Sequence, residues 1–441
     1  MKVTNDTGLE LTWLQADTNF PEPFATFVIK GTYDIVPDGV CTQAATQRPI
    51  SDDQRHMDGI GRSLSWASDL APFKPNSDFL ILGTFHQPGG IARPTGQAGF
   101  SFGPLRKDVA VFGPRMTVRP PGGRPVMTAP EPFTSLPLRW EYSAGGLRYP
   151  GNPMGLGGDV RTLESGERVR TMPRIENPDH LIRMAADRPQ PVNFAPVPPF
   201  FRFRRQKLGT RDQRWSLFRA PLPPEDFDPS YYNAAPPDQQ GGNCPRGDET
   251  LVLRNMHPKY PELRTRLPGV LARLAVLRRT AEQVTAEAVA MELDTVVAIP
   301  DEEQIVLVWR GRCPVSHRRN MSELFWVGAE MEPLAGPAAS PRLPDRLMRA
   351  YQDGLDAEVA AAKAKADDEA AEAAALDDHI ATTLASIRKL LGQAKLPPDL
   401  ARIVAVENDP ATLYEHLKKF VEDGLAELHR RYPHALDEAG P

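Results

Sequence analysis

The chain has 441 residues and a formal net charge of −5, with 41% hydrophobic and 25% charged residues, which is typical of a soluble globular protein with a sizeable core. A negative net charge does not indicate nucleic-acid binding. The sequence has no apolar run of about 18 residues, so we expect a cytoplasmic protein with no membrane insertion. Cys41, Cys244 and Cys313 are widely spaced and odd in number, which predicts neither a disulfide framework nor a metal knuckle.

The first part of the chain is predicted to form strands. Residues 24–36 are rich in β-branched and aromatic side chains and end at a Pro-Asp-Gly turn. Residues 78–85 form a short apolar run, as expected of a buried strand, and residues 108–113 alternate between apolar and polar side chains. Residues 267–280 are compatible with either a strand or a helix.

The clearest prediction is a β-hairpin at residues 288–311. In its first strand, Glu292 and Asp294 stand at even-numbered positions. Residues 300–303 are predicted to form the turn, and residues 305–309 the second strand. The odd-numbered positions carry apolar side chains, which are therefore predicted to share one face of the strand. They are Val289, Met291, Leu293, Val297 and Ile299.

No pattern of alternating strands and helices is visible, so a parallel sheet is not expected. We therefore predict a mainly β body at residues 1–340, built as an antiparallel β-sandwich or barrel-like structure in one or two lobes. Proline is abundant, with 46 residues, about twice the usual share of roughly 5%. The proline-rich residues 173–237, here called the strap, are predicted to lie over the body as a long, ordered loop segment.

Residues 345–441 are predicted to form an acidic α-helical region. They hold 12 basic and 19 acidic residues, a net charge of −7. An alanine-rich stretch predicts one continuous helix, and Asp409 followed by Pro410 predicts the start of another. Their apolar stripes could pair as a helical hairpin, or the outer side of the hairpin could dock a partner helix. The stripe residues are Leu347, Tyr351, Leu355 and Val359, then Leu376, Ile380, Leu384, Ile387 and Leu391, and finally Leu413, Leu417, Phe420, Leu425 and Leu428.

A search for catalytic patterns finds no phosphate-binding loop and no zinc-binding helix. Ser63 lies in a Gly-Arg-Ser-Leu-Ser string that lacks the second glycine of a nucleophile elbow. Asp52, Asp53, His56 and Asp58 could supply oxygen and imidazole ligands to a divalent metal, although a solvated loop is the simpler interpretation. A hydrolase or metal-dependent enzyme that uses Ser63 or this cluster is the alternative function.

Two segments of the strap are candidates for partner binding. Aromatic residues alternate with arginines at Arg202, Phe203, Arg204 and Arg205, a composition found at protein interfaces and in single-strand nucleic-acid sites. The net charge favours a protein contact. Tyr231 and Tyr232 could add contact area in the stiff segment at residues 228–240, or that segment could only cover the sheet.

A series of strings resembles a bacterial family long labelled a domain of unknown function and encoded in type VI secretion gene clusters. The resemblance covers roughly residues 1–315 and leaves out the helical tail. It implies a cytoplasmic adaptor or chaperone that binds a toxin effector and loads it onto the VgrG spike, with no catalytic residues, metal or cofactor. Oligomeric state stays open. The strings lie at residues 103–107, 111–115, 136–142, 152–157, 173–199, 232–239, 293–296 and 308–311.

Overall fold

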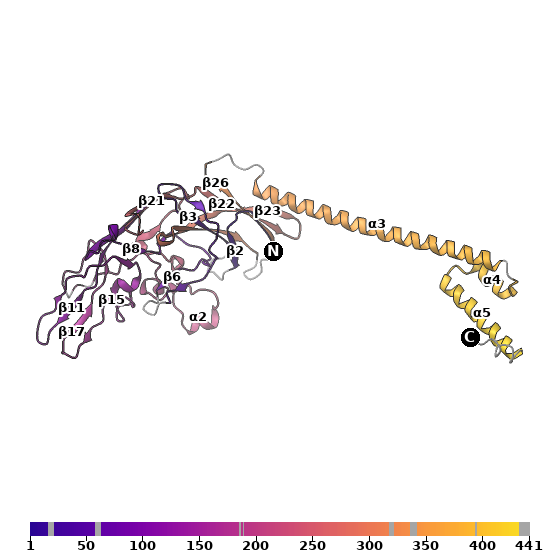
Figure 1. Cartoon of the computed structure of the whole chain (residues 1–441), viewed down its shortest axis with the longest axis horizontal. Helices are drawn as coiled ribbons and strands as arrows, with labels where there is room; N and C mark the ends of the chain where they lie inside the picture. The colour runs from indigo at the N-terminus through magenta and orange to yellow at the C-terminus, as the bar shows by residue number, and fades with distance from the viewer. Residues whose placement is uncertain are drawn as a thin grey trace. The chain divides into compact units, whose positions relative to one another are not determined.

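The computed structural model describes residues 1–15, 22–57, 63–184, 187, 189–316, 322–335, 342–392 and 395–431 (Figure 1). The protein is mainly β, with 33% strand and 27% helix, and its long helices lie in a C-terminal segment, which confirms the predicted fold class. The sheets do not close into a barrel. Contacts divide the chain into two compact units, residues 1–349 and 350–441.

A seven-stranded mixed sheet forms the centre of the first unit. Neighbouring strands within this sheet are antiparallel, except β7 and β24, which are parallel. The predicted strand at residues 24–36 and the predicted hairpin are both confirmed, as β3 and as β24 with β25. The strands are β19 (Gln240–Gly241), β7 (Ser77–Ile81), β24 (Met291–Ile299), β25 (Gln304–Pro314), β3 (Phe24–Asp34) and β2 (Glu10–Gln15), with β4 (Thr42–Gln43) beside β3.

One detail of the predicted hairpin is wrong: its apolar residues do not share one face. The register shifts between Leu293 and Thr295, so Asp294 is the extra residue of a β-bulge. Leu293 therefore lies in the main core, whereas Val297 and Ile299 pack in a second cluster. At the bulge, the buried carboxylate of Asp294 forms an ion pair with a buried arginine of β25.

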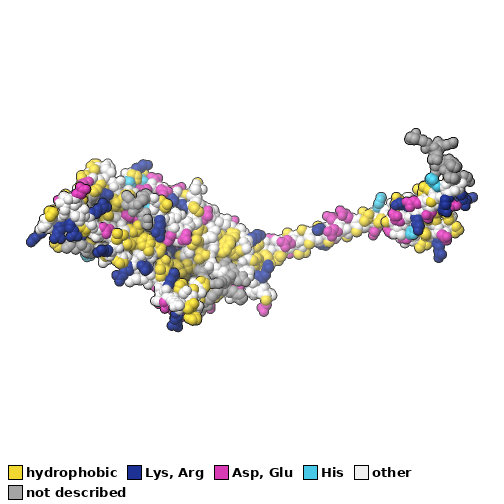
Figure 2. Space-filling view, turned by 90° about the horizontal axis from the view of Figure 1, so that it is seen from below, with side chains coloured by type: hydrophobic (Ala, Val, Ile, Leu, Met, Phe, Trp, Pro, Cys, Tyr) yellow, Lys and Arg dark blue, Asp and Glu magenta, His cyan; other side chains and the backbone are white. Residues whose placement is uncertain are grey.

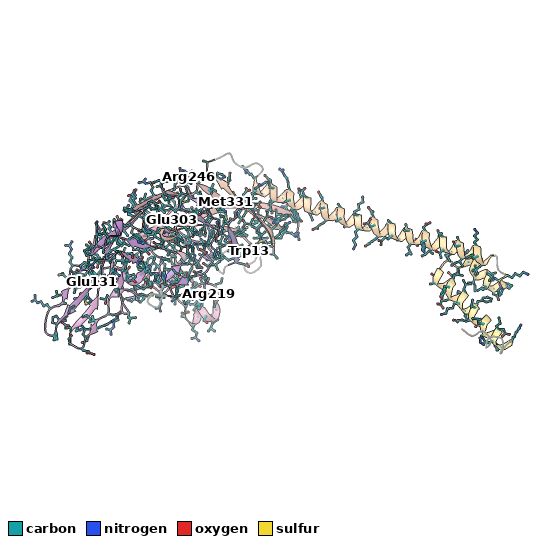
Figure 3. The ribbon with its side chains drawn as sticks, viewed as in Figure 1. Trp13, Glu131, Arg219, Arg246, Glu303 and Met331 are labelled. Carbon is teal, nitrogen blue, oxygen red and sulfur yellow. The ribbon has the colours of Figure 1, made fainter. Side chains whose placement is uncertain are left out.

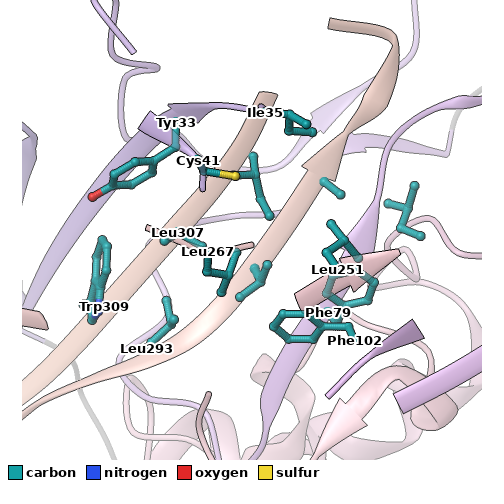
Figure 4. Packing of buried hydrophobic residues seen from close by; sticks show 14 of the residues in the cluster. Tyr33, Ile35, Cys41, Phe79, Phe102, Leu251, Leu267, Leu293, Leu307 and Trp309 are labelled. Carbon is teal, nitrogen blue, oxygen red and sulfur yellow. The ribbon is translucent and has the colours of Figure 1, made fainter. Parts of the chain in front are cut away.

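A five-stranded antiparallel sheet shares the main core with this central sheet (Figure 4). The ring of Phe79 from β7 lies 4.6 Å from that of Phe100 and 4.7 Å from that of Phe102, so aromatic side chains join the two sheets. The predicted strand at residues 108–113 belongs here. The order is β18 (Ile175–Glu176), β10 (Leu105–Phe112), β9 (Thr95–Phe102), β20 (Thr250–Arg254) and β21 (Glu262–Arg266).

A four-stranded sheet completes the core, and the ambiguous residues 267–280 contribute its strand β22. The first turns of α3 pack on it: Leu347 is buried, and a Cβ at Gly328 would lie 3.3 Å from its side chain. Glycine thus permits the close approach of the helix. The strands are β1 (Lys2–Asn5), parallel to β26 (Leu324–Pro333), then β22 (Val270–Arg279) and β23 (Val284–Val289).

Smaller elements extend the body. The predicted strand at residues 78–85 is divided into β7 and β8, because the chain turns at Gly83, where a Cβ would lie 2.8 Å from Pro300. A second four-stranded sheet consists of β12 (Val126–Met127), β11 (Met116–Arg119), β17 (Arg168–Thr171) and β16 (Arg161–Thr162). This sheet, together with the turns between β11 and β12 and between β16 and β17, is here called the wing. The short pairs are β5 (Gln54–Arg55) with β6 (Leu64–Trp66), β8 (Thr84–His86) with β13 (Ser135–Pro137), and β14 (Ala144–Gly145) with β15 (Leu156–Gly157). The 3-10 turns are η1 (Pro88–Gly90), η2 (Trp140–Tyr142), η3 (Gln206–Leu208), η4 (Pro229–Tyr232), η5 (Pro237–Gln239) and η6 (Pro300–Glu302).

The helical segment contains α3 (Leu343–Leu391), α4 (Pro398–Val406) and α5 (Pro410–Arg431). The continuous helix is confirmed, and Asp409 caps α5 by accepting a hydrogen bond from the Thr412 N–H at 3.1 Å. Helix α4 was not predicted. It supplies Leu400 and Val404 to a small core with Leu384 and Leu413. No described helix combines the length and apolar character that crossing a bilayer requires.

Candidate partner-binding site

The string at residues 232–239 is fixed to the central sheet by buried polar groups, and we call it the anchor string. The Asn233 amide donates to the backbone oxygen of Asn76 at 2.7 Å and to Asp78 Oδ1 at 2.9 Å. The backbone N–H of Ala234 donates to the other oxygen of Asp78 at 2.9 Å. Because all of these partners except Asn76 are buried, the contacts hold the end of the strap in one position.

The other end of the anchor string is held as firmly. The buried Gln239 amide donates to the backbone oxygens of Phe79 at 2.8 Å and Phe194 at 3.0 Å. Lys107 Nζ donates to Gln239 Oε1 and to Asp238 Oδ1, both at 2.8 Å. Burial lowers the pKa of Lys107 to about 8, against the opposing attraction of Asp238. The anchor string is therefore part of the scaffold.

A buried network of charged side chains begins at Asp78 and extends across the central sheet. Lys74 Nζ donates to Asp78 at 2.8 Å and to Thr295 Oγ1 at 2.7 Å, and Thr295 in turn donates to Asp294 at 2.8 Å. Asp294 forms an ion pair with Arg310. The side chains of these charged residues are almost completely excluded from solvent, so each charge depends on its neighbour.

The network ends at Asp69. Arg310 donates to the Asp69 backbone oxygen at 2.7 Å, and Lys30 Nζ donates to the Asp69 carboxylate at 2.7 Å. Burial lowers the pKa of Lys30, while the Asp69 charge opposes that shift. The strings at residues 293–296 and 308–311 thus contribute charged groups that pair with one another inside the fold.

Other strings of the resemblance have the same structural role. Arg115 and Glu176 form a buried ion pair, and Glu176 also accepts the Ile182 N–H at 2.8 Å. Burial raises the pKa of Glu176. The buried Asn152 amide donates to the backbone oxygen of Trp140 at 2.8 Å, which closes the loop between these residues.

The predicted partner-binding residues come together on α1 (Arg202–Arg205) and η4, but their environments differ. Arg204 is buried: it donates to the Tyr231 backbone oxygen at 3.0 Å and to the Val197 backbone oxygen at 2.7 Å. It therefore holds the strap from inside. Its neighbours Arg202 and Arg205 are exposed.

An aromatic row runs beside these residues. Tyr231 and Tyr232 are both half-buried, and Tyr232 lies 5.4 Å from Phe227 and 5.6 Å from Phe73. Burial raises the pKa of Tyr232 to about 12. Phe73 also lines a groove of ≈ 550 Å³ with Phe24, Lys74 and Arg312 among its walls. The tyrosines thus connect the strap to this groove.

The sequence analysis missed a protruding part of the strap at residues 210–226, here called the lobe. Its helix α2 (Gln213–Phe218) projects from the body in Figure 1. The solvent-exposed fraction is 66% for Leu217 and 83% for Phe218. Two signals were available: Asp212 is an N-cap residue, and an apolar pair follows arginines in an otherwise turn-rich segment.

The lobe is held by its own hydrogen bonds. Thr210 Oγ1 donates to Asp226 at 2.7 Å and closes the neck. Trp215 Nε1 donates to the Leu222 backbone oxygen at 2.8 Å, and Arg219, labelled in Figure 3, donates to the Pro223 backbone oxygen at 2.6 Å. On the face of the body from which α2 projects, hydrophobic and basic side chains lie side by side (Figure 2). The lobe is therefore a preformed, mixed apolar and basic surface.

The residues of the alternative, enzymatic function are placed differently. Ser63 is 0% exposed, and its hydroxyl donates to Glu141 at 2.8 Å, so this conformation closes it to a substrate. Asp58 lies outside the described residues. Among the residues that are described, no three His, Cys, Asp or Glu side chains are grouped to hold a metal. Asp53 instead accepts the backbone N–H of Ser68 at 2.8 Å.

Comparison with known proteins identifies a family. Residues 22–310 match the model of DUF2169, described as an uncharacterized protein conserved in bacteria, and this range includes the anchor string and most of the ionic network. No curated protein and no solved structure matches the chain. Since the match covers well over half of the sequence, the chain belongs to the bacterial family DUF2169.

Proposed function

We propose that this protein is a cytoplasmic adaptor or chaperone that binds a type VI secretion toxin and loads it onto the VgrG spike. The sequence resemblance described above suggests this role. One structural observation carries it further: the strap is fixed by buried polar groups at its anchor string, yet presents α1 and the lobe to solvent.

The physical advantage of this arrangement is low entropic cost. A loop that is already ordered loses less conformational freedom on binding than a flexible one, so more of the contact energy becomes affinity. The hydrogen bonds at the neck and within the lobe supply this order before any partner arrives. Exposed apolar and arginine side chains are the types that dominate protein interfaces.

The fold also separates two tasks. The strings of the resemblance mostly supply buried anchors, such as Asn233, Gln239 and Arg310, whereas the exposed surface of the lobe lies outside the anchor string. A common scaffold of this kind can carry different contact surfaces for different toxins. This separation supports an adaptor role more than a shared catalytic centre.

Co-expression and affinity purification test the proposal. The full chain is expressed with each toxin and each VgrG protein encoded beside it, and with a variant in which residues 211–225 are replaced by a short Gly-Ser linker. The neck contact between Thr210 and Asp226 brings the ends of this excision together. We expect a soluble complex of the wild type with one toxin, higher toxin abundance in its presence, and loss of the complex with the variant.

The control is the distal turn of the wing, where Leu163 is exposed and is replaced by Ala. This control is expected to bind the toxin as the wild type does. Absence of any toxin or spike complex with the wild type would contradict the adaptor function.

A further inference from the structure

The charges of the lobe and α1 are unbalanced. Each acidic side chain of the lobe already has a partner: Asp212 accepts the Trp215 N–H at 2.8 Å, Glu225 pairs with Arg219 at 3.6 Å, and Asp226 accepts from Thr210. The remaining arginines are exposed, and within the described part of the chain none forms an ion pair. They are Arg202, Arg205, Arg211 and Arg214.

An apolar tip lies on α2, the helix that also carries Arg214. Leu217 and Phe218 are exposed at the end of α2, whose start is capped by Asp212 and whose end is tied back by the Trp215 indole. Phe203 of α1 is 37% exposed, with Lys207 Nζ 4.1 Å from its ring centre. Exposed apolar side chains on a lobe with internal hydrogen bonds, together with the four exposed arginines, form a surface that is complementary to carboxylates around an apolar group.

We infer that α1 and the lobe bind an acidic protein segment that carries an aliphatic or aromatic anchor side chain. This inference deepens the proposed function and rests on it for the view that the lobe contacts a protein. Guanidinium groups match carboxylates through paired hydrogen bonds, so Asp and Glu of the partner are the expected ligands of the arginines. The anchor side chain covers Leu217 and Phe218.

A lipid surface or a nucleic acid fits these observations less well. Helix α2 has six residues, which is too short to lie along a membrane as an amphipathic helix. Single-strand nucleic-acid sites combine a basic groove with a series of stacking faces, whereas this chain as a whole carries a formal net charge of −5. A protein segment remains the favoured ligand, and both other classes are outcomes of the test.

The first experiment places a photo-crosslinking amino acid, benzoylphenylalanine, at Phe218 of the full chain in native bacterial cells. The matched control carries it at Leu163, which is also exposed but lies on the wing. Mass spectrometry of the crosslinked peptide identifies the contacted segment. We expect a crosslink specific to Phe218, in a segment rich in Asp and Glu around an apolar residue.

The second experiment exchanges charges. Arg205→Glu with Arg214→Glu is expected to weaken binding of the crosslinked protein by about tenfold or more, as interface hot spots do. Replacing the acidic residues of the contacted segment by Lys is expected to restore binding to this variant alone. Arg124→Glu with Arg161→Glu, on the wing, is the control and is expected to leave binding unchanged.

The outcomes separate the inference from the proposed function. A toxin or spike contacted through a neutral or basic segment overturns the inference and leaves the adaptor function standing. An acidic segment of an unrelated protein, with rescue by charge exchange, supports the inference and contradicts the adaptor function. Crosslinking to lipid or nucleic acid, or no crosslink above that at Leu163, overturns the inference.

Discussion

The anchor string at residues 232–239 and the lobe at residues 210–226 are close in the sequence, but their polar groups are used differently. In the anchor string, Asn233 and Gln239 are buried and bonded to the central sheet. In the lobe, the hydrogen bonds are internal, and Arg211, Arg214 and the apolar tip are left to solvent. The comparison teaches that a segment such as the anchor string can fix a surface without being part of it.

The largest effect is expected from breaking the anchor. Asp78→Ala removes the acceptor of Asn233 and Ala234 and leaves Lys74 as a buried charge without its counter-ion. We expect the free energy of unfolding to fall by about 3–5 kcal/mol, as for other broken buried ion pairs. Urea denaturation measures it. A loss below about 1 kcal/mol would show that the anchor string does not carry the stability of this region.

The next effect concerns pH. The folded-state pKa of Lys107 is about 8, below the ordinary lysine value of 10.5, so the unfolded chain binds more protons between these two pH values. The unfolding free energy therefore gains a contribution that rises with pH in this window, by up to about 1.4 kcal/mol per pH unit. This contribution is absent below pH 8.

Lys107→Met removes the titrating group, so its unfolding free energy should rise less steeply than that of the wild type from pH 8 to 10. Denaturation curves at several pH values give both slopes. Lys74→Met, which also removes a buried amine, is the matched control. Equal slopes for wild type and Lys107→Met would contradict the assignment.

A smaller effect is expected at Ser63. Ser63→Ala removes the hydroxyl that donates to the buried Glu141 carboxylate, while the Ser63 backbone N–H still donates at 2.8 Å. We expect a loss of about 1.5–3 kcal/mol in unfolding free energy, the range for hydrogen bonds to charged groups. Toxin binding below the melting temperature should be unchanged. Loss of delivery with unchanged stability would instead favour the hydrolase alternative.

The smallest change in stability is expected at the lobe. Leu217→Ala with Phe218→Ala removes exposed side chains and should alter the unfolding free energy by less than about 0.5 kcal/mol. Partner binding should nevertheless be lost, which is the reverse of the Ser63 result. A large loss of stability would mean that the tip is packed in solution, and the contrast between anchor and lobe would fail.

The sequence by itself determined the elements whose pattern is local. Richness in β-branched and aromatic residues predicted β3, and alternation predicted the hairpin. The alanine-rich stretch predicted α3, and Asp409 with Pro410 predicted the start of α5. These signals depend on residues a few positions apart, whose relative placement follows from helix or strand geometry alone. The mainly β class followed from the same patterns.

Tertiary structure decided the rest, because it depends on which distant segments meet. Lys74 and Thr295 are 221 residues apart in sequence, and only the folded chain brings them into contact beside the bulge at Asp294. Arg204 and Arg205 are adjacent residues of the same type, yet Arg204 is buried and donates to strap backbone oxygens, whereas Arg205 is exposed. Exposure of Leu217 and Phe218 likewise follows from the neck and cap contacts, since hydropathy alone would have placed both side chains in the core.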